Sequence, residues 1–124
     1  MRRIVLGFLI STVCGMQAQA ESASSYQNSC NRIQVIGSTL TASCRRMDGS
    51  FSNASILIRG IHNNNGVLQF GGMGQASSFQ NSCRNIEVVG STLSANCRRM
   101  DGGFNRTTIL IRGIHNNNGV LVYQ

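Results

Sequence analysis

Apolar and polar residues alternate along most of the chain, in short segments separated by turn residues. Ile33 and Val35 alternate with polar neighbours, and after a Gly-Ser interruption Leu40, Ala42 and Cys44 fall on one face of the next segment. A period of two residues is typical of β-strands with one buried face. The pattern therefore predicts a succession of short strands.

Turn signals separate these strands. Asp48-Gly49 precedes the β-branched run at 56–58, and Asn65-Gly66 precedes the apolar segment at 67–70. Asp-Gly and Asn-Gly pairs between alternating segments are the usual signature of β-hairpins. No segment holds a 3.6-residue period long enough for a major helix. The sequence predicts an all-β protein.

The sequence is duplicated. Shifted by 53 residues, positions 24–51 nearly overlay positions 77–104, and "ILIRGIHNNNGVL" recurs without change. One repeat of about fifty residues would be marginally stable alone, so repeats at about 24–70 and 77–123 predict one pseudo-symmetric domain spanning 21–124. We expect the glycine-rich segment 71–76 to be a flexible connector. Because such a hinge can exchange halves between chains, we expect a monomer or a domain-swapped dimer.

The N-terminal segment has the features of a secretory leader. Arg2 and Arg3 precede a short apolar run, and Ala18-Gln-Ala20 is a small-x-small cleavage pattern. These features predict a secretory signal peptide over 1–20, cleaved after Ala20, and a secreted or periplasmic protein. The run is too short to span a bilayer. A lipoprotein would need acylation of Cys14, and Val13 is bulky for the preceding position.

Removal of the leader leaves four cysteines. An even number in a small exported chain favours two disulfides, and equal spacing in the two repeats makes pairing within each repeat the simplest of three arrangements. Neither a C-x-x-C pair nor a histidine near a cysteine is present, so we expect no metal site. The cysteines are Cys30, Cys44, Cys83 and Cys97.

The predicted mature chain is basic, with nine arginines against four carboxylates, a net charge of 9 − 4 = +5. That charge can attract polyanions. Aromatic residues do not interleave with the arginines as they do in single-strand nucleic-acid binders, so we expect no nucleic-acid partner. We also expect no enzyme, because the one repeated carboxylate lies in an Asp-Gly turn and no catalytic set emerges.

Both repeats place [FY]-x-x-S-C before an isoleucine-containing strand, then G-S-T-L-x-x-x-C, then N-G-V-L-x-[FY]. This order resembles cyanovirin-N and its homologues, a family of secreted mannose-binding lectins, over nearly the whole mature chain. The resemblance implies an all-β domain in which the second half of each repeat packs with the other repeat. It also implies the disulfides Cys30–Cys44 and Cys83–Cys97, no cofactor, and two carbohydrate sites at opposite ends.

The resemblance assigns each site to the start of one repeat, the turn after its second cysteine, and the Asn-rich loop of the other repeat. Asn, Ser and Arg suit sugar hydroxyls, which both donate and accept hydrogen bonds. The first site would use Ser25, Asn28, Ser29, Arg45, Met47, Asn116, Asn117 and Asn118. The second would use Ser78, Asn81, Ser82, Arg98, Met100, His62, Asn63 and Asn65.

Some positions depart from the family. Acidic groups are frequent where this chain has Arg45, Arg98, His62 and Asn65, so two ligand hypotheses stand. The first is mannose-rich oligosaccharides with α-linked mannose, and the alternative is an acidic or sulfated polysaccharide or another polyanion. We further expect Met47 and Met100 to pack near the sites and the six aromatic residues after the leader to lie in the core. Asn53 and Asn105 begin acceptor sequons, which are glycosylated only in a eukaryotic source.

Overall fold

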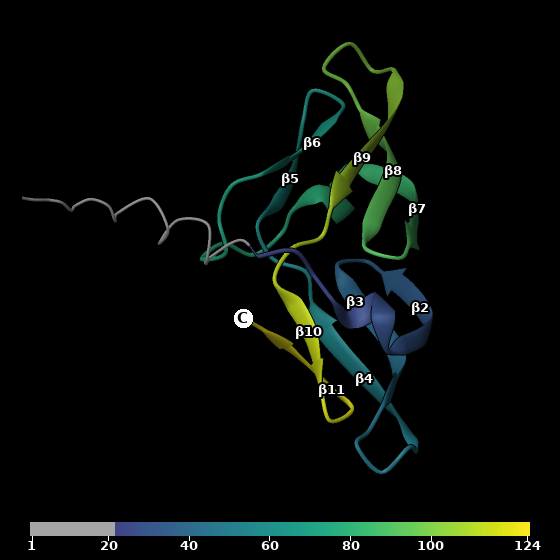
Figure 1. Ribbon diagram of the computed structural model, residues 1–124. Coiled ribbons are helices and arrows are strands. Elements are labelled where there is room, and N and C mark those ends of the chain that lie inside the picture. Colours follow the sequence, from purple (N-terminus) through teal and green to yellow (C-terminus); the bar gives the residue numbers. More distant parts are fainter. Residues whose placement is uncertain (1–21) are drawn as a thin grey trace, which may run out of the picture.

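The computed structural model describes residues 22–124 (Figure 1). The predicted leader lies outside these residues. Within them, no helix is long and apolar enough to cross a membrane. The first repeat holds the 3-10 turn η2 (Tyr26–Asn28) and the strands β2 (Cys30–Ile36), β3 (Thr39–Arg45), β4 (Phe51–Leu57), β5 (Ile61–Asn64) and β6 (Val67–Phe70). The second repeat holds η3 (Phe79–Asn81), β7 (Cys83–Val89), β8 (Thr92–Arg98), β9 (Phe104–Leu110), β10 (Ile114–Asn117) and β11 (Val120–Tyr123).

Each repeat forms a three-stranded antiparallel sheet followed by a separate hairpin. The sheets have the orders β2-β3-β4 and β7-β8-β9, and the hairpins are β5-β6 and β10-β11. The predicted Asp-Gly and Asn-Gly turns close the hairpins. At the Asn-Gly turns both residues have positive φ, 53° at Asn65 and 88° at Gly66, as a type I′ turn requires. The all-β prediction is confirmed.

The hairpins are exchanged between the repeats. The β5-β6 hairpin packs beside β9, and the β10-β11 hairpin packs beside β4 (Figure 1). Equivalent backbone hydrogen bonds join each hairpin to the start of the other repeat. Ser25 N–H donates to the Ile114 carbonyl and Ser78 N–H to the Ile61 carbonyl, both at 3.0 Å. Because of this exchange, each end of the molecule contains residues from both repeats, as the resemblance implies.

The core follows the strand alternation. Leu40 and its counterpart Leu93 are fully buried, as are Tyr26 and Phe79 beneath the 3-10 turns. The Tyr26 hydroxyl donates to the Gly90 carbonyl at 2.6 Å, and burial raises its pKa to about 12. The cysteine pairing within each repeat is confirmed, since Cys30–Cys44 and Cys83–Cys97 join directly opposite residues of adjacent strands.

One expectation of burial was wrong. Phe51 and Phe104 lie on the outer faces of their sheets, 50% and 40% exposed, because they open their strands on the side away from the core. Hydrogen bonds join the connector 71–76 to the first repeat. Arg59 donates through Nε to the Met73 carbonyl at 2.8 Å, and Gly60 N–H donates to the Gln75 carbonyl at 2.9 Å.

Candidate functional site

Each end of the molecule brings together the three segments that the sequence assigns to a site. At the first end, η2 and the start of β2 meet the β3-β4 turn and the loop of the β10-β11 hairpin. At the second end, η3 and the start of β7 meet the β8-β9 turn and the loop of the β5-β6 hairpin. Both predicted sets of residues are therefore gathered, each at its own end.

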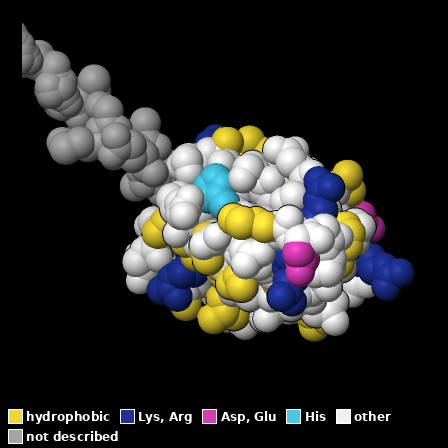
Figure 2. All heavy atoms as spheres, turned by 60° about the horizontal axis from the view of Figure 1, so that its bottom comes forward, with side chains coloured by type: hydrophobic (Ala, Val, Ile, Leu, Met, Phe, Trp, Pro, Cys, Tyr) yellow, Lys and Arg dark blue, Asp and Glu magenta, His cyan; other side chains and the backbone are white. Residues whose placement is uncertain are grey.

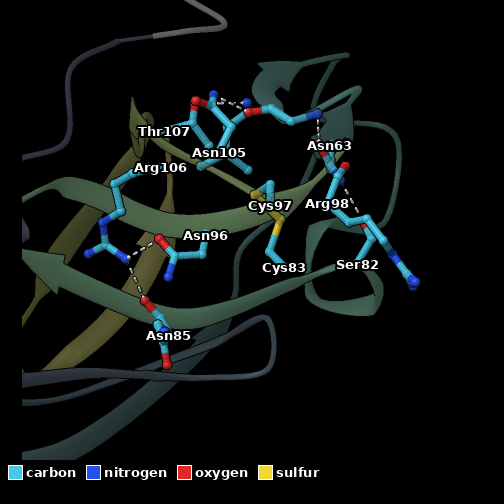
Figure 3. The surroundings of a disulfide bond; sticks show 12 residues. Asn63, Ser82, Cys83, Asn85, Asn96, Cys97, Arg98, Asn105, Arg106 and Thr107 are labelled. Atoms are coloured by element: carbon cyan, nitrogen blue, oxygen red, sulfur yellow. Dashed lines mark hydrogen bonds between the residues drawn. A yellow bond between two sulfur atoms is a disulfide. The ribbon is translucent and has the colours of Figure 1, made fainter. Parts of the chain in front are cut away.

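Asn116 fastens the exchanged loop at the first end. Its Nδ2 donates to Ser29 Oγ at 2.8 Å and to the Arg45 carbonyl at 2.9 Å, and its Oδ1 accepts from Gly119 N–H at 2.8 Å. Asn63 makes the same three bonds at the second end, to Ser82, to the Arg98 carbonyl and from Gly66 N–H (Figure 3). Both N–H groups of each amide are occupied, so Asn116 and Asn63 act as latches between repeats.

Asn118 and Asn65 supply a second latch. Asn118 Oδ1 accepts from Met47 N–H at 2.9 Å, and Asn65 Oδ1 accepts from Met100 N–H at 2.8 Å. Both asparagines have a φ of 53°, a left-handed conformation that asparagine tolerates better than most residues. Each amide oxygen is engaged, which leaves the Nδ2 donors of Asn118 and Asn65 to meet a ligand.

Histidines contact the serines at both ends. His62 Nδ1 lies 2.6 Å from Ser78 Oγ, as the second predicted set implies. His115 Nδ1 lies 2.6 Å from Ser25 Oγ, so His115 belongs to the first end although the sequence analysis did not assign it there. The repeat contained the signal, because His62 and His115 occupy equivalent positions.

The groups still available to a ligand are polar and exposed. Asn28 and Asn81 end the 3-10 turns and are exposed, and so is Asn117. Arg45 and Arg98 are exposed too, and Arg98 extends away from Asn63 and Ser82 in Figure 3. Within residues 22–124, the side chains of these five residues form no hydrogen bond or ion pair. They provide donors and acceptors with no carboxylate among them.

Met47 and Met100 do not pack against the sites as expected. Both side chains are 86% exposed. Only their backbone N–H groups are engaged, by the second latch, because the turns that carry them project from the sheets. Any part that these methionines take in ligand contact would come from an exposed thioether, not from a packed wall.

The adjacent aspartates stabilise their own turns. Asp48 Oδ1 accepts from Ser50 Oγ at 2.6 Å and Ser50 N–H at 2.9 Å, and Asp101 Oδ1 accepts from Gly103 N–H at 2.9 Å. The Ser50 hydroxyl lowers the pKa of Asp48 most, and the Gly103 N–H lowers that of Asp101 most. These carboxylates therefore hold turn geometry and lie at opposite ends of the molecule.

A shallow hollow of about 170 Å³ adjoins the first end. Predicted residues Asn28, Ser29 and Arg45 line it, together with Asn31 and Phe51 on the neighbouring strands. Figure 2, which turns the bottom of Figure 1 forward, shows arginine side chains dispersed over a largely polar surface. The positive charge is therefore not gathered into one patch on this face.

Comparison with known proteins extends these observations. Residues 26–122 match the model of the CVNH domain. The structure of TbCVNH from T. borchii is 33% identical, with a TM-score of 0.67 over 81% of this chain and 99% of that chain. A complex of microvirin with mannobiose is 27% identical, with a TM-score of 0.64 over 82% and 99%. A MoCVNH3 variant in complex with (N-GlcNAc)4 is 23% identical, with a TM-score of 0.69 over 83% and 99%, and so shares the fold.

Proposed function

Because the chain belongs to the CVNH family, we propose that it is a carbohydrate-binding lectin with two pseudo-equivalent sites, one at each end. The observation that carries this proposal is the pair of latched loops. At each end an exchanged Asn-Gly loop is fixed against a serine and an arginine carbonyl by one asparagine. A loop held in one position, with unpaired side-chain amides beside it, suits a ligand whose hydroxyls both donate and accept hydrogen bonds.

We propose α-linked mannose in mannose-rich oligosaccharides as the preferred ligand. The resemblance to microvirin, whose structure contains mannobiose, supports this choice. Each net hydrogen bond to a hydroxyl contributes about 0.5–1.5 kcal/mol, so single-site affinity should be modest. Two sites on one rigid body raise the avidity for a branched glycan by about 10²–10⁴-fold where both engage.

The alternative ligand is an acidic or sulfated polysaccharide, bound through arginine. The exposed guanidinium groups of Arg45 and Arg98 favour it, since no carboxylate pairs with them among residues 22–124. The dispersal of arginines in Figure 2 favours the neutral sugar instead. Polyanion binding by charge weakens steeply with salt, whereas hydrogen bonding to a neutral sugar changes little.

We also propose that the protein acts outside the cytoplasm after cleavage of residues 1–20. The two disulfides support this localisation, because they persist in oxidising compartments. Mass spectrometry of the protein exported from its own source tests the cleavage after Ala20. A mature N-terminus at Glu21 is the expected result, and a retained leader would refute the proposal.

A glycan array on the oxidised protein, residues 21–124, tests the ligand. We expect signal on mannose-terminated oligosaccharides that is equal at low and moderate salt. Signal confined to sulfated or carboxylated glycans and lost at moderate salt would replace the mannose proposal with the alternative. An array silent on every glycan would refute the lectin proposal itself.

A further inference from the structure

The outer face of the β2-β3-β4 sheet carries a groove that the proposed sites do not include. Its volume is about 370 Å³, and it runs along the solvent side of the sheet. Residues of all three strands line it, among them Ala42 and Ala54. The other lining residues are Arg32, Gln34, Thr41, Ser43, Asn53 and Ser55.

The equivalent surface of the second repeat is filled by the protein itself. Arg106, which replaces Asn53, extends across the sheet (Figure 3). Its Nη1 donates to the Asn85 carbonyl at 3.0 Å and to Asn96 Oδ1 at 3.3 Å, and its Nη2 lies 3.5 Å from Glu87 Oε1. The guanidinium thus satisfies a carbonyl, a side-chain oxygen and a carboxylate in the position of the open groove.

The first repeat retains the groups but lacks the arginine that would cover them. Arg32, Gln34 and Ser43 stand at the positions of Asn85, Glu87 and Asn96. No intramolecular hydrogen bond or ion pair engages their side chains within residues 22–124. Arg32 faces no carboxylate in this groove, because Gln34 occupies the position of Glu87. The first groove therefore presents polar groups whose partners must come from outside the chain.

A second difference between the repeats lies nearer the ends. In the second repeat, Arg84 covers Phe104, with its guanidinium carbon 3.9 Å from the ring centroid. In the first repeat Asn31 takes the place of Arg84, and Phe51 is 50% exposed beside the hollow of 170 Å³. An uncovered ring offers an apolar face to the C–H groups of a sugar.

The hollow and the groove are lined by neighbouring positions of the same strands, and together they define a path along one face of the sheet. On β4, Phe51 lines the hollow and Asn53, two residues on and on the same face, lines the groove. On β3, Arg45 lines the hollow and Ser43 lines the groove. The path leads from the proposed site at the first end inward along the sheet, and Arg84 and Arg106 cover its counterpart in the second repeat.

We propose that this path is an extended subsite that binds additional saccharide units of an oligosaccharide held at the first end. Phe51 supplies a packing surface, and Gln34, Ser43 and Arg32 hydrogen-bond the outlying hydroxyls. The second end, whose path is covered, binds only the terminal units. This inference rests on the proposed function, and it makes the two sites unequal in the length of glycan that they recognise.

Swapping residues between the repeats tests the proposal with matched variants. The covering variant carries Asn31→Arg, Gln34→Glu and Asn53→Arg, which place in the first repeat the counterparts of Arg84, Glu87 and Arg106. The uncovering variant carries Arg84→Asn and Arg106→Asn. All three proteins are produced without N-glycosylation, so Asn53 is unmodified, and thermal unfolding checks their folding. Amide NMR titrations follow each end separately through Met47 and Met100, with α-linked manno-oligosaccharides of two to six units.

We expect affinity at the first end of the unsubstituted protein to rise about tenfold with chain length, as two or three added hydrogen bonds would give. Affinity at the second end should stay flat. The covering variant should lose the rise at the first end, while its second end should bind every oligosaccharide as the unsubstituted protein does. The uncovering variant should gain a rise at the second end, a result that misfolding cannot produce.

Equal length dependence at the two ends, or a rise at the first end that the covering variant keeps, would overturn the extended subsite while the lectin proposal stood. Absence of binding at both ends by every oligosaccharide would instead refute the mannose proposal, and this inference with it. Either swapped variant alone decides the matter if the other fails to fold.

Discussion

Replacing Asn116 with alanine should loosen the first end without unfolding the protein. Asn116 makes three hydrogen bonds: two join β10 to the other repeat, at 2.8 and 2.9 Å, and one fixes its own loop, at 2.8 Å. At about 0.5–1.5 kcal/mol each, and with part of the loss recovered by water at this half-buried position, we expect destabilisation of about 2 kcal/mol. For a domain of this size that corresponds to a fall in Tm of about 8–16 °C.

The assay combines thermal unfolding with mannobiose titration at each end. Asn116→Ala should lower both Tm and binding at the first end, because its loop would lose its fixed position. Asn63→Ala should produce the same loss at the second end, since its three bonds are equivalent. Asn28→Ala is the matched control. The Asn28 side chain is exposed and has no intramolecular partner in the described chain, so the substitution should change stability by less than about 0.5 kcal/mol while weakening first-end binding.

An unchanged Tm for Asn116→Ala, with binding at the first end abolished, would refute this reasoning. Asn116 would then be a ligand contact and not a latch. A Tm that falls equally for Asn28→Ala and Asn116→Ala would refute it too, because it would show that the hydrogen bonds between repeats carry no special weight.

Three further predictions concern stability. Stability should fall between about pH 10 and pH 12, because burial raises the pKa of Tyr26 and the folded state keeps a proton that the unfolded chain loses. The loss from Tyr26 is at most about 2.7 kcal/mol for a two-unit shift. Burial also raises the pKa of Tyr123, so Tyr26→Phe, which copies Phe79, should reduce the loss in urea unfolding across that range without abolishing it, and an unchanged loss would contradict this. Replacing Cys83 and Cys97 together by serine should cost about 3 kcal/mol, the loop-closure value for a 14-residue separation; an unchanged denaturation midpoint would contradict this. The pKa of Asp48 is lowered in the folded state, so ionised Asp48 stabilises the fold above the ordinary aspartate pKa, and this stabilisation is lost as the pH falls through the lowered folded-state pKa. Asp48→Asn should therefore reduce the loss of stability in acid. An identical acid dependence in the variant would argue against the turn hydrogen bonds.

The duplication made most of the architecture predictable. Strand alternation and the Asp-Gly and Asn-Gly turns located the hairpins, and equal cysteine spacing made pairing within each repeat the simplest arrangement. The exchange of hairpins followed from the family resemblance, not from the pattern. Periodicity specifies which face of a strand is buried, but it does not specify which repeat buries it.

The roles of individual site residues were harder to predict from the sequence. Asn116 and Asn63 were assigned to ligands, yet their amides bond to the opposite repeat, which only the docked position of the hairpin reveals. The exposure of Met47 and Met100 likewise depends on how far their turns project. His115 could have been included from the repeat alone.

The covered and open grooves illustrate the same limit. The replacement of Asn53 by Arg106 is visible in the sequence as one difference between near-identical repeats. That this replacement covers the groove can be predicted only from the strand register, which places Arg106 opposite Asn96 and its guanidinium within reach of the Asn85 carbonyl.

The most direct test of two carbohydrate sites is an amide NMR titration of the oxidised protein with mannobiose, at low and at moderate salt. We predict that the Met47 and Met100 amides, which report the two latched loops, shift saturably and independently, with affinities that salt leaves unchanged. Shifts absent from both amides, or present only at low salt, would contradict the account.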